Sequence, residues 1–164
     1  MSTRSDSLDR LTALSSQLQS SQSSTLAPAT STATMASPAR PPITCHVLDT
    51  TTGLPASSIP VTLTPLSPTT SSTPFTATTN SDGRVTAWQT QPSSPSLSDL
   101  FANNTSARAW SLIFDIGGYY EAKGIKSFWP DVEIRFVTRP EDAKEHYHVP
   151  LLVGPFSYTA YRGS

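Results

Sequence analysis

The sequence predicts an all-β sandwich with one short helix, preceded by a leader that has no fold of its own. From residue 43 onward, short segments rich in β-branched residues alternate between apolar and polar positions. Glycine, proline and asparagine separate these segments, as they do at tight turns. One segment, at 117–124, could hold a helical turn or two. Many short strands with one brief helix are typical of two packed sheets.

The first 42 residues have a different composition from the rest of the chain. Ser and Thr dominate this stretch, with several prolines. It offers too little apolar surface to offset the entropy lost on ordering. We therefore expect a disordered leader at 1–42 and one folded domain at 43–164. The spacing of four leucines predicts a short amphipathic helix in the leader when it is bound: Leu8, Leu11, Leu14 and Leu18.

Part of the leader resembles a targeting signal. Arg10-Leu11 and Gln17-Leu18 are separated by five residues, as in the N-terminal peroxisomal targeting nonapeptide. An import receptor reads such a signal as an address, and it is not a membrane anchor. Residues 10–18 therefore predict a peroxisomal location through an import receptor. The alternative is a cytoplasmic location, because four loosely specified positions also occur by chance.

The folded domain is expected to consist of paired strands joined by short turns. Asp82-Gly83 supplies the positive-φ positions that a tight reversal needs. Pro- and Ser-rich segments at 65–74 and 89–108 are expected to be surface loops, because neither could fill a sheet interior. The expected strand pairs are 43–49 with 59–66, 75–79 with 84–89, and 149–153 with 156–161. Two further strands are expected on either side of the helical segment, at 110–116 and 132–138.

Composition excludes several classes of protein. The formal net charge is −1 and the basic residues are scattered, so a nucleic-acid partner is not expected. The sequence contains neither the ~18 consecutive apolar residues of a membrane span nor the apolar core of a secretory signal. We expect a soluble intracellular protein without a membrane partner. Cys45 is the only cysteine, so no internal disulfide is expected.

The three histidines are the first candidates for chemistry. In the first strand His46 shares a face with Thr44, whereas Cys45 points the other way, so Cys45 and His46 are not a nucleophile and its base. His146 and His148 project from one face of another strand. This spacing fits inert structural histidines, metal-free acid–base catalysis, or a three-histidine zinc site completed by His46.

An arginine and the chain end are further candidates. Arg84 follows the Asp-Gly turn directly, and it is either a solvated surface residue or an anchor for an anionic or carbonyl-rich ligand. A cation at this position would also favour the neutral form of a nearby imidazole. The last four residues are unusual for a chain end, because a phenol and a hydroxyl follow a strand directly.

Several segments together resemble a known family. They are CHVLD at 45–49, SDGR at 81–84, FWPDV at 128–132, HYHVPLL at 146–152 and YRGS at 161–164. In this order they resemble the 5-hydroxyisourate hydrolases, the enzymatic branch of the transthyretin-like family. The resemblance covers residues 43–164 and is most specific in the tail.

This resemblance implies a transthyretin-like (prealbumin) β-sandwich that forms a homotetramer with sites between subunits. It implies hydrolysis of 5-hydroxyisourate to 2-oxo-4-hydroxy-4-carboxy-5-ureidoimidazoline in urate degradation, without a metal or other cofactor. Position by position, it implies that His46, His148 and Ser164 are catalytic and that His46, Arg84 and Tyr161 bind substrate. It assigns no role to His146, and which histidine acts as the base is left open.

A different function is compatible with the same fold. A non-enzymatic transthyretin-like carrier would bind a small aromatic ligand in the central channel. Such a carrier is expected to have a secretory signal and other residues at positions 46, 84 and 148. The hydrolase is therefore the favoured prediction and the carrier is the alternative.

Overall fold

The first strand shows how alternation divides the chain between a core and an outer face. In β1 (Ile43–Asp49), Ile43, Cys45 and Val47 are fully buried, whereas the intervening residues point to the other face. The computed structural model describes residues 40–66, 73–103, 105–142 and 145–164, which belong to one compact unit. The targeting segment at 10–18, the leader up to residue 39 and most of the 65–74 loop lie outside the described residues.

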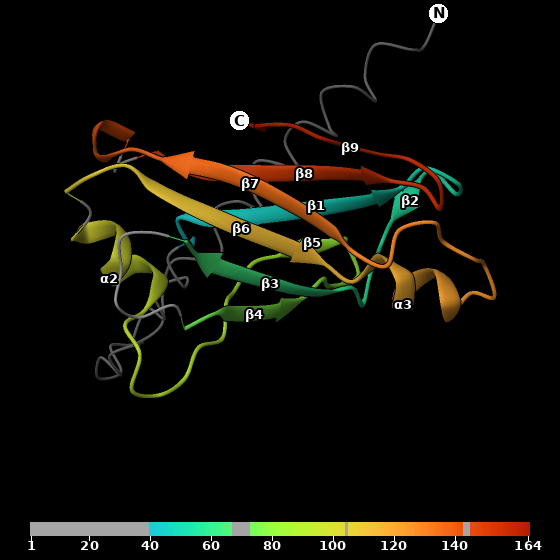
Figure 1. Cartoon of the computed structure of the whole chain (residues 1–164), viewed down its shortest axis with the longest axis horizontal. Helices are drawn as coiled ribbons and strands as arrows, with labels where there is room; N and C mark the ends of the chain where they lie inside the picture. Colours follow the sequence, from blue (N-terminus) through green and yellow to red (C-terminus); the bar gives the residue numbers. More distant parts are fainter. Residues whose placement is uncertain (1–39, 67–72, 104, 143–144) are drawn as a thin grey trace, which may run out of the picture. The chain divides into compact units, whose positions relative to one another are not determined.

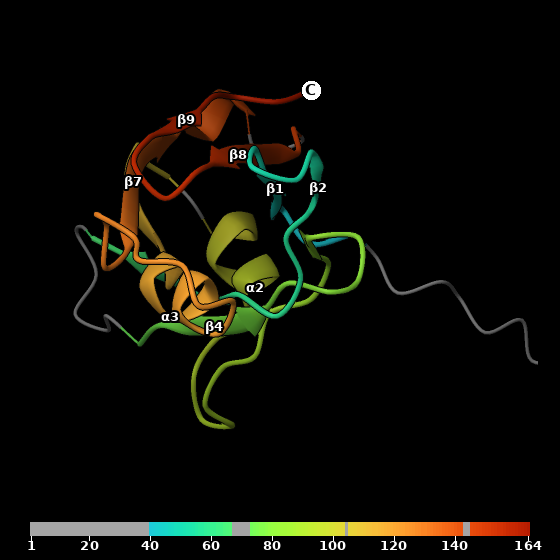
Figure 2. The same cartoon turned by 90° about the vertical axis from the view of Figure 1, so that its right-hand side faces the viewer.

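Two sheets form the sandwich (Figures 1 and 2). Sheet A contains, in order, β2 (Leu54–Pro55), β1, β8 (Tyr147–Val153) and β9 (Tyr158–Ala160), and β5 (Arg84–Val85) also pairs with β1. Sheet B contains, in order, β4 (Phe75–Thr78), β3 (Pro60–Pro65), β6 (Arg108–Phe114) and β7 (Val132–Thr138). The largest fully buried side chains include Trp110, Phe114, Leu63 and Leu151. The all-β prediction is therefore confirmed.

The centre of sheet A is a parallel pair. β1 and β8 are in register from Ile43 opposite Tyr147 to Asp49 opposite Val153. On the inner face Cys45 lies beside Val149 and Val47 beside Leu151, and all four side chains are buried. Burial at 25 cal/mol per Å² of apolar surface makes such a strip a main source of stability. The outer face of the same two strands is left for polar side chains.

Two of the expected hairpins are wrong. β1 and β3 lie in different sheets, and the hairpin partner of β1 is the short β2. β4 and β5 also lie in different sheets, so the Asp82-Gly83 turn carries the chain from sheet B to sheet A. Alternation of apolar and polar residues shows that a strand is half-buried. The same alternation is expected whichever sheet the strand joins, so it does not predict the strand's partner. The expected pair β8–β9 is confirmed, and β6 and β7, predicted only as separate strands, also pair in the antiparallel sense.

The expected helix is present, and a second one was missed. α3 (Ile116–Glu121) overlaps the predicted helical turn, and η1 (Pro140–Asp142) is a single 3-10 turn. α2 (Leu97–Ala102) lies inside 89–108, so a surface loop is the wrong interpretation there. Ser96 and Asp99 form a reciprocal capping box, a signal that was present in the sequence.

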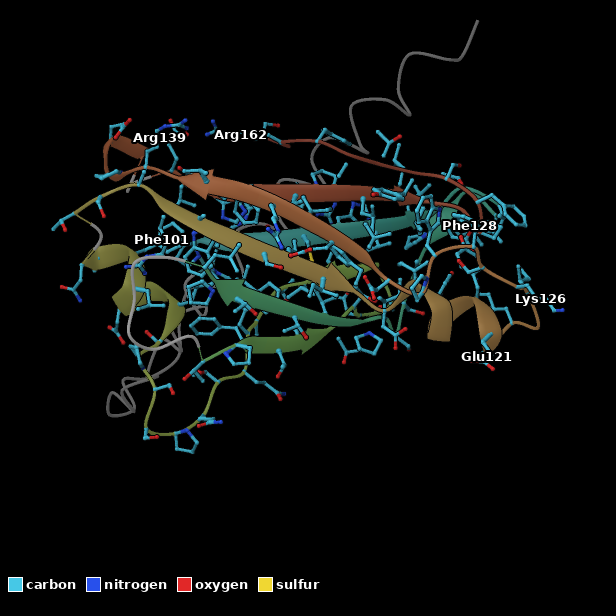
Figure 3. All side chains as sticks on the ribbon, viewed as in Figure 1. Phe101, Glu121, Lys126, Phe128, Arg139 and Arg162 are labelled. Atoms are coloured by element: carbon cyan, nitrogen blue, oxygen red, sulfur yellow. The ribbon has the colours of Figure 1, made fainter. Side chains whose placement is uncertain are left out.

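Helix α2 contributes to the core. Leu97 and Phe101 are buried, and the Phe101 ring lies 5.8 Å from Trp110 and 6.0 Å from Tyr147 between centroids. Figure 3 places Phe101 at the end of the sandwich opposite Phe128. Within the described part of the chain, no helix has the length and apolarity that a membrane crossing requires.

Asp49 joins β1 to α3 through a buried carboxylate. Alternation puts Asp49 on the inner face, and its side chain is fully buried. It accepts hydrogen bonds from the Tyr119 hydroxyl at 2.9 Å, the Lys123 ammonium at 3.0 Å and the Thr51 hydroxyl at 2.6 Å. Burial alone would raise the pKa of Asp49, but these hydrogen bonds together lower it far below the ordinary value.

We expect Asp49→Asn to reduce the free energy of unfolding by about 2–4 kcal/mol, because the Lys123 and tyrosine donors lose a charged acceptor whose side chain is fully buried. Urea denaturation at equal protein concentration measures this loss. Because the folded pKa is depressed, the stabilisation by Asp49 exists above the unfolded pKa of about 4 and is lost as the pH falls below it.

The matched control is Arg135→Gln, which breaks the exposed Arg135–Glu133 ion pair. It should cost far less than Asp49→Asn, because an ion pair in solvent contributes little to stability. Equal losses for the two variants would contradict the role given to Asp49.

Candidate active site

The outer face of sheet A gathers the histidines predicted from the sequence. In the β1–β8 register Thr44 lies opposite His148, and His46 lies opposite Pro150. Thr44 and His148 are buried, with 5% and 9% of their surfaces exposed, and His46 is half-buried. The two strands therefore bring side chains about a hundred residues apart in sequence onto one surface.

His46 has one ring nitrogen engaged and one unengaged. A hydrogen bond joins its ring to the backbone of Asp82. The Nε2 atom is buried and has no hydrogen-bond partner among the described residues, so the bond to Asp82 involves Nδ1. Burial and then the charge of Arg84 lower the pKa of His46, and Asp82 partly opposes them. His46 is therefore a neutral imidazole near pH 7.

The turn before β5 fixes Arg84 beside His46. Gly83 has a φ of +69°, and a Cβ there would lie 2.4 Å from the Val47 carbonyl oxygen. Glycine is thus required both by the left-handed backbone and by the close approach to β1. Val47 N donates to Gly83 O at 2.8 Å, and Arg84 pairs with His46 across the two strands. The Arg84 side chain is exposed and also lines a hollow of about 560 Å³ together with Thr44.

His148 is also held neutral. Burial has the largest effect in lowering its pKa, and the positive charge of Arg84 has the next largest. His146, Arg40 and His46 act in the same direction. The His148 Nδ1 atom lies 2.8 Å from the Thr44 hydroxyl oxygen, so this ring is held by a defined contact. The site therefore contains two neutral imidazoles, His46 and His148, near the Arg84 guanidinium.

The C-terminal tail crosses His148. Gly163 N donates to the His148 carbonyl oxygen at 2.9 Å, and Tyr161 N donates to Pro150 O at 3.4 Å. A Cβ on Gly163 would lie only 2.7 Å from the Cδ2 atom of the His148 ring. The tail therefore packs against the Cδ2 side of the imidazole.

Arg162 holds the tail down on its other side. It forms an ion pair with Glu145, and its guanidinium lies 5.3 Å from the centre of the Tyr147 ring. Figure 3 shows Arg162 beside the chain end, above β8.

The structure places the two tail candidates in different hollows. Ser164 lines a hollow of about 500 Å³ with His146 and Gly163. Tyr161 is half exposed and lines another hollow, of about 290 Å³, with His148 and residues of β7. His46, Arg84 and His148 are brought together, whereas Ser164 lies beside His146 and Tyr161 lines a hollow with the edge strand β7.

The other sequence candidates are placed clearly. Burial raises the pKa of the Cys45 thiol to about 12, which suits its predicted place in the core. His146 lies next to His148, with ring centroids 6.2 Å apart. No group of three His, Cys, Asp or Glu side chains among the described residues is arranged to hold a metal ion.

Comparison with known proteins identifies the family. The model of the HIUase/Transthyretin family matches residues 43–163. The chain belongs to this family. It is 39% identical over 130 residues to the 5-hydroxyisourate hydrolase of Mus musculus, covering 75% of this chain and 95% of the relative.

Solved structures of the HIUase/Transthyretin type share the fold. The Klebsiella pneumoniae 5-hydroxyisourate hydrolase superposes with a TM-score of 0.52 at 27% identity, over 74% of this chain and 98% of that one. Sea bream transthyretin in complex with thyroxine gives a TM-score of 0.59 at 26% identity, over 74% and 94% of the two chains. The predicted transthyretin-like fold is thus confirmed.

Two residues of the site were not singled out from the sequence. Thr44 was placed on the His46 face, but its contacts with two imidazoles depend on the β1–β8 register. Gly163 packs so closely against His148 that a larger side chain would clash with the ring. No sequence pattern predicts this contact.

We expect Arg84→Gln to raise the pKa of both His46 and His148 toward the ordinary value of about 6.5, because the variant removes a positive charge that disfavours each imidazolium. Arg84→Lys keeps the charge and should change both values less. NMR titration of the imidazole protons measures them. His146 is an internal control, because Arg84 does not influence its pKa. Unchanged titration of His46 and His148 would contradict this electrostatic coupling.

Proposed function

We propose that this chain hydrolyses 5-hydroxyisourate to 2-oxo-4-hydroxy-4-carboxy-5-ureidoimidazoline in urate degradation. The observation that carries the proposal is the arrangement of two neutral imidazoles and one guanidinium beneath a tail that ends in Tyr-Arg-Gly-Ser. The name of the Mus musculus relative, 5-hydroxyisourate hydrolase, supports the same activity. A mean hydropathy of −0.25 and a near-neutral charge fit an enzyme of a small polar metabolite.

The proposed reaction needs no cofactor. A neutral histidine takes a proton from water while the water oxygen attacks the ring amide carbonyl. Arg84 holds carbonyl oxygens of the substrate and stabilises the negative charge that grows during the attack. The C–N bond then breaks, and the proton returns from the imidazolium to the leaving nitrogen. Reactants and products therefore differ by one water.

Residues of the tail position the substrate in this proposal. The Ser164 hydroxyl, which lines a hollow with His146 and Gly163, orients water or substrate. Tyr161 is assigned to substrate binding across a subunit boundary, because its ring lies at the edge of the sandwich.

We further propose a homotetramer with sites between subunits. Among the described residues, the C-terminal tail lies against His148 on the outer face of sheet A. β7 and β9 are edge strands, whose outer backbone groups are free to pair. Large apolar side chains are exposed on or next to these strands: Val137, Phe128 and Phe156. Light scattering tests the proposal, and a monomer at micromolar concentration would contradict it.

The peroxisomal location remains a proposal that rests on residues 10–18. The basic-Leu and Gln-Leu pairs at the required spacing support it. Microscopy of a C-terminally untagged chain with Arg10→Ala and Leu11→Ala, detected by antibody, tests it. A distribution that does not change would favour the cytoplasm.

The function is tested by the ultraviolet decay of 5-hydroxyisourate, generated in place from urate by urate oxidase. We expect the protein to accelerate the decay beyond the spontaneous rate, with and without excess chelator. His148→Ala should lower kcat by 10²–10⁴-fold, as is usual when a general base is removed. Glu121→Gln on the exposed face of α3 is the control and should keep full activity.

Each contrary outcome has a definite meaning. Activity lost only with chelator would revive the three-histidine zinc interpretation. No acceleration by a folded protein, together with saturable binding of an aromatic ligand, would favour the carrier.

We expect Gly163→Ala to reduce kcat/KM by about tenfold or more, because the added methyl group pushes the tail or the His148 ring out of position. The melting temperature should change little, since the tail is at the surface. Activity and differential scanning fluorimetry measured on one preparation separate the two effects. Full activity in Gly163→Ala would show that the tail does not need to lie against His148.

A further inference from the structure

The Thr44 hydroxyl lies between two imidazoles. Its Oγ1 atom is 2.8 Å from His148 Nδ1 and 2.8 Å from His146 Nε2. The two rings are nearly parallel, with an interplanar angle of 23°. His146 and Thr44 have no part in the reaction proposed above, although they contact the ring that does. Their hydrogen bonds restrict which nitrogen of His148 carries a proton.

The protons of this chain of hydrogen bonds can be assigned from its far end. The His146 ring makes a hydrogen bond to the backbone of Pro41. Proline has no N–H, so the partner is the carbonyl oxygen, an acceptor. Because Nε2 of His146 contacts Thr44, the nitrogen that donates to Pro41 is Nδ1. Burial and the charge of Arg40 lower the pKa of His146, so this ring is neutral and its Nε2 is bare.

The assignment then passes through Thr44. A hydroxyl has one hydrogen and two lone pairs. Its hydrogen goes to the bare Nε2 of His146, so the oxygen accepts from the remaining partner, His148 Nδ1. His148 therefore carries its proton on Nδ1. In a neutral imidazole this leaves Nε2 with a free lone pair.

We propose that Thr44 and His146 are positioning residues that hold His148 in the Nδ1–H tautomer, so that Nε2 is ready to accept a proton. The catalytic consequence rests on the proposed hydrolysis, and it makes His148 the general base. A reversed Thr44 hydroxyl would donate to His148 Nδ1 and leave a proton on Nε2. That tautomer presents a donor to water and has no lone pair there to accept its proton.

The proton count closes in this arrangement. A water O–H bond breaks and the Nε2–H bond of His148 forms, while the water oxygen bonds to the substrate carbonyl carbon. The resulting imidazolium keeps its Nδ1–H bond to Thr44, which accepts through a lone pair and continues to donate to His146. When the C–N bond breaks, the Nε2 proton moves to the leaving nitrogen and His148 returns to its initial tautomer.

The test measures the tautomer directly by ¹⁵N NMR of imidazole-labelled full-length protein above the titration of its histidines. Only three histidines are present, so single substitutions assign every signal. The expected result is a protonated Nδ1 and a bare Nε2 for His148. In His146→Phe the hydroxyl loses its acceptor and turns to His148, so the Nε2–H form should increase. The kcat should fall about tenfold or more while KM stays nearly constant.

Conservative variants separate tautomer control from folding. His146→Gln can still accept the hydroxyl hydrogen through Oε1, and Thr44→Ser keeps the hydroxyl, so both should retain the wild-type tautomer and most of the activity. Thr44→Val removes the hydroxyl at similar volume and should lower kcat. Combined with His146→Phe it should add little further loss, because both substitutions break the same chain.

The outcomes distinguish this proposal from the proposed function. A wild-type His148 with its proton on Nε2 would overturn it, and so would an unchanged tautomer in both His146→Phe and Thr44→Val. The spectra need no substrate. A tautomer shift as expected, in a protein that hydrolyses no 5-hydroxyisourate, would overturn the function and the catalytic purpose of the arrangement together. Normal hydrolysis with an unmoved tautomer would overturn the positioning role alone.

Discussion

The parallel pairing of β1 with β8 is the interaction on which both the fold and the candidate site depend. Its inner face supplies buried apolar side chains that join the two sheets, including Cys45, Val47 and Leu151. Its outer face sets Thr44 against His148. Alternation makes these two roles inseparable, because a slip of one residue would exchange the faces of β1. The packing energy of the core therefore also fixes the chemistry on the surface.

Electrostatics adds a second constraint on that surface. Arg84 and Arg40 both act on His148, and Arg84 acts on His46 as well. The nearest opposing charge among the described residues is Asp82, which influences His46. Neutral imidazoles next to cations form a surface that attracts electron-rich oxygens and retains basic lone pairs at neutral pH. Such a surface suits a substrate with several carbonyl groups.

The sequence was sufficient where a property depends on local pattern. The alternation of β1 predicted that Cys45 is buried and that His46 shares a face with Thr44, and the structure agrees. Sheet membership is a long-range property, so 43–49 and 59–66 were paired although they lie in different sheets. α2 was missed because the Ser-rich surroundings outweighed a capping box at Ser96, whose short helix is stabilised by burying Phe101.

The candidate site shows the same limit at finer scale. His46, Arg84 and His148 could be named because family segments contain them. The position of the Thr44 hydroxyl between two rings required the register of strands from opposite ends of the domain. The contact of Gly163 with the His148 ring depends on the course of the C-terminal backbone, which hydrophobic periodicity does not predict.

The sequence separation within the central pair has a consequence for how the chain acquires its structure. Thr44 and His148 are 104 residues apart, so the edge of β1 that pairs with β8 has no partner until most of the chain has been synthesised. Closing so large a loop costs entropy before any contact compensates it, and domains with such distant pairings fold slowly. A nascent chain that has emerged only through β7 exposes one whole edge of β1, a strand rich in β-branched and apolar residues. Recruitment of a chaperone to that edge during translation is the expected cellular counterpart of this topology.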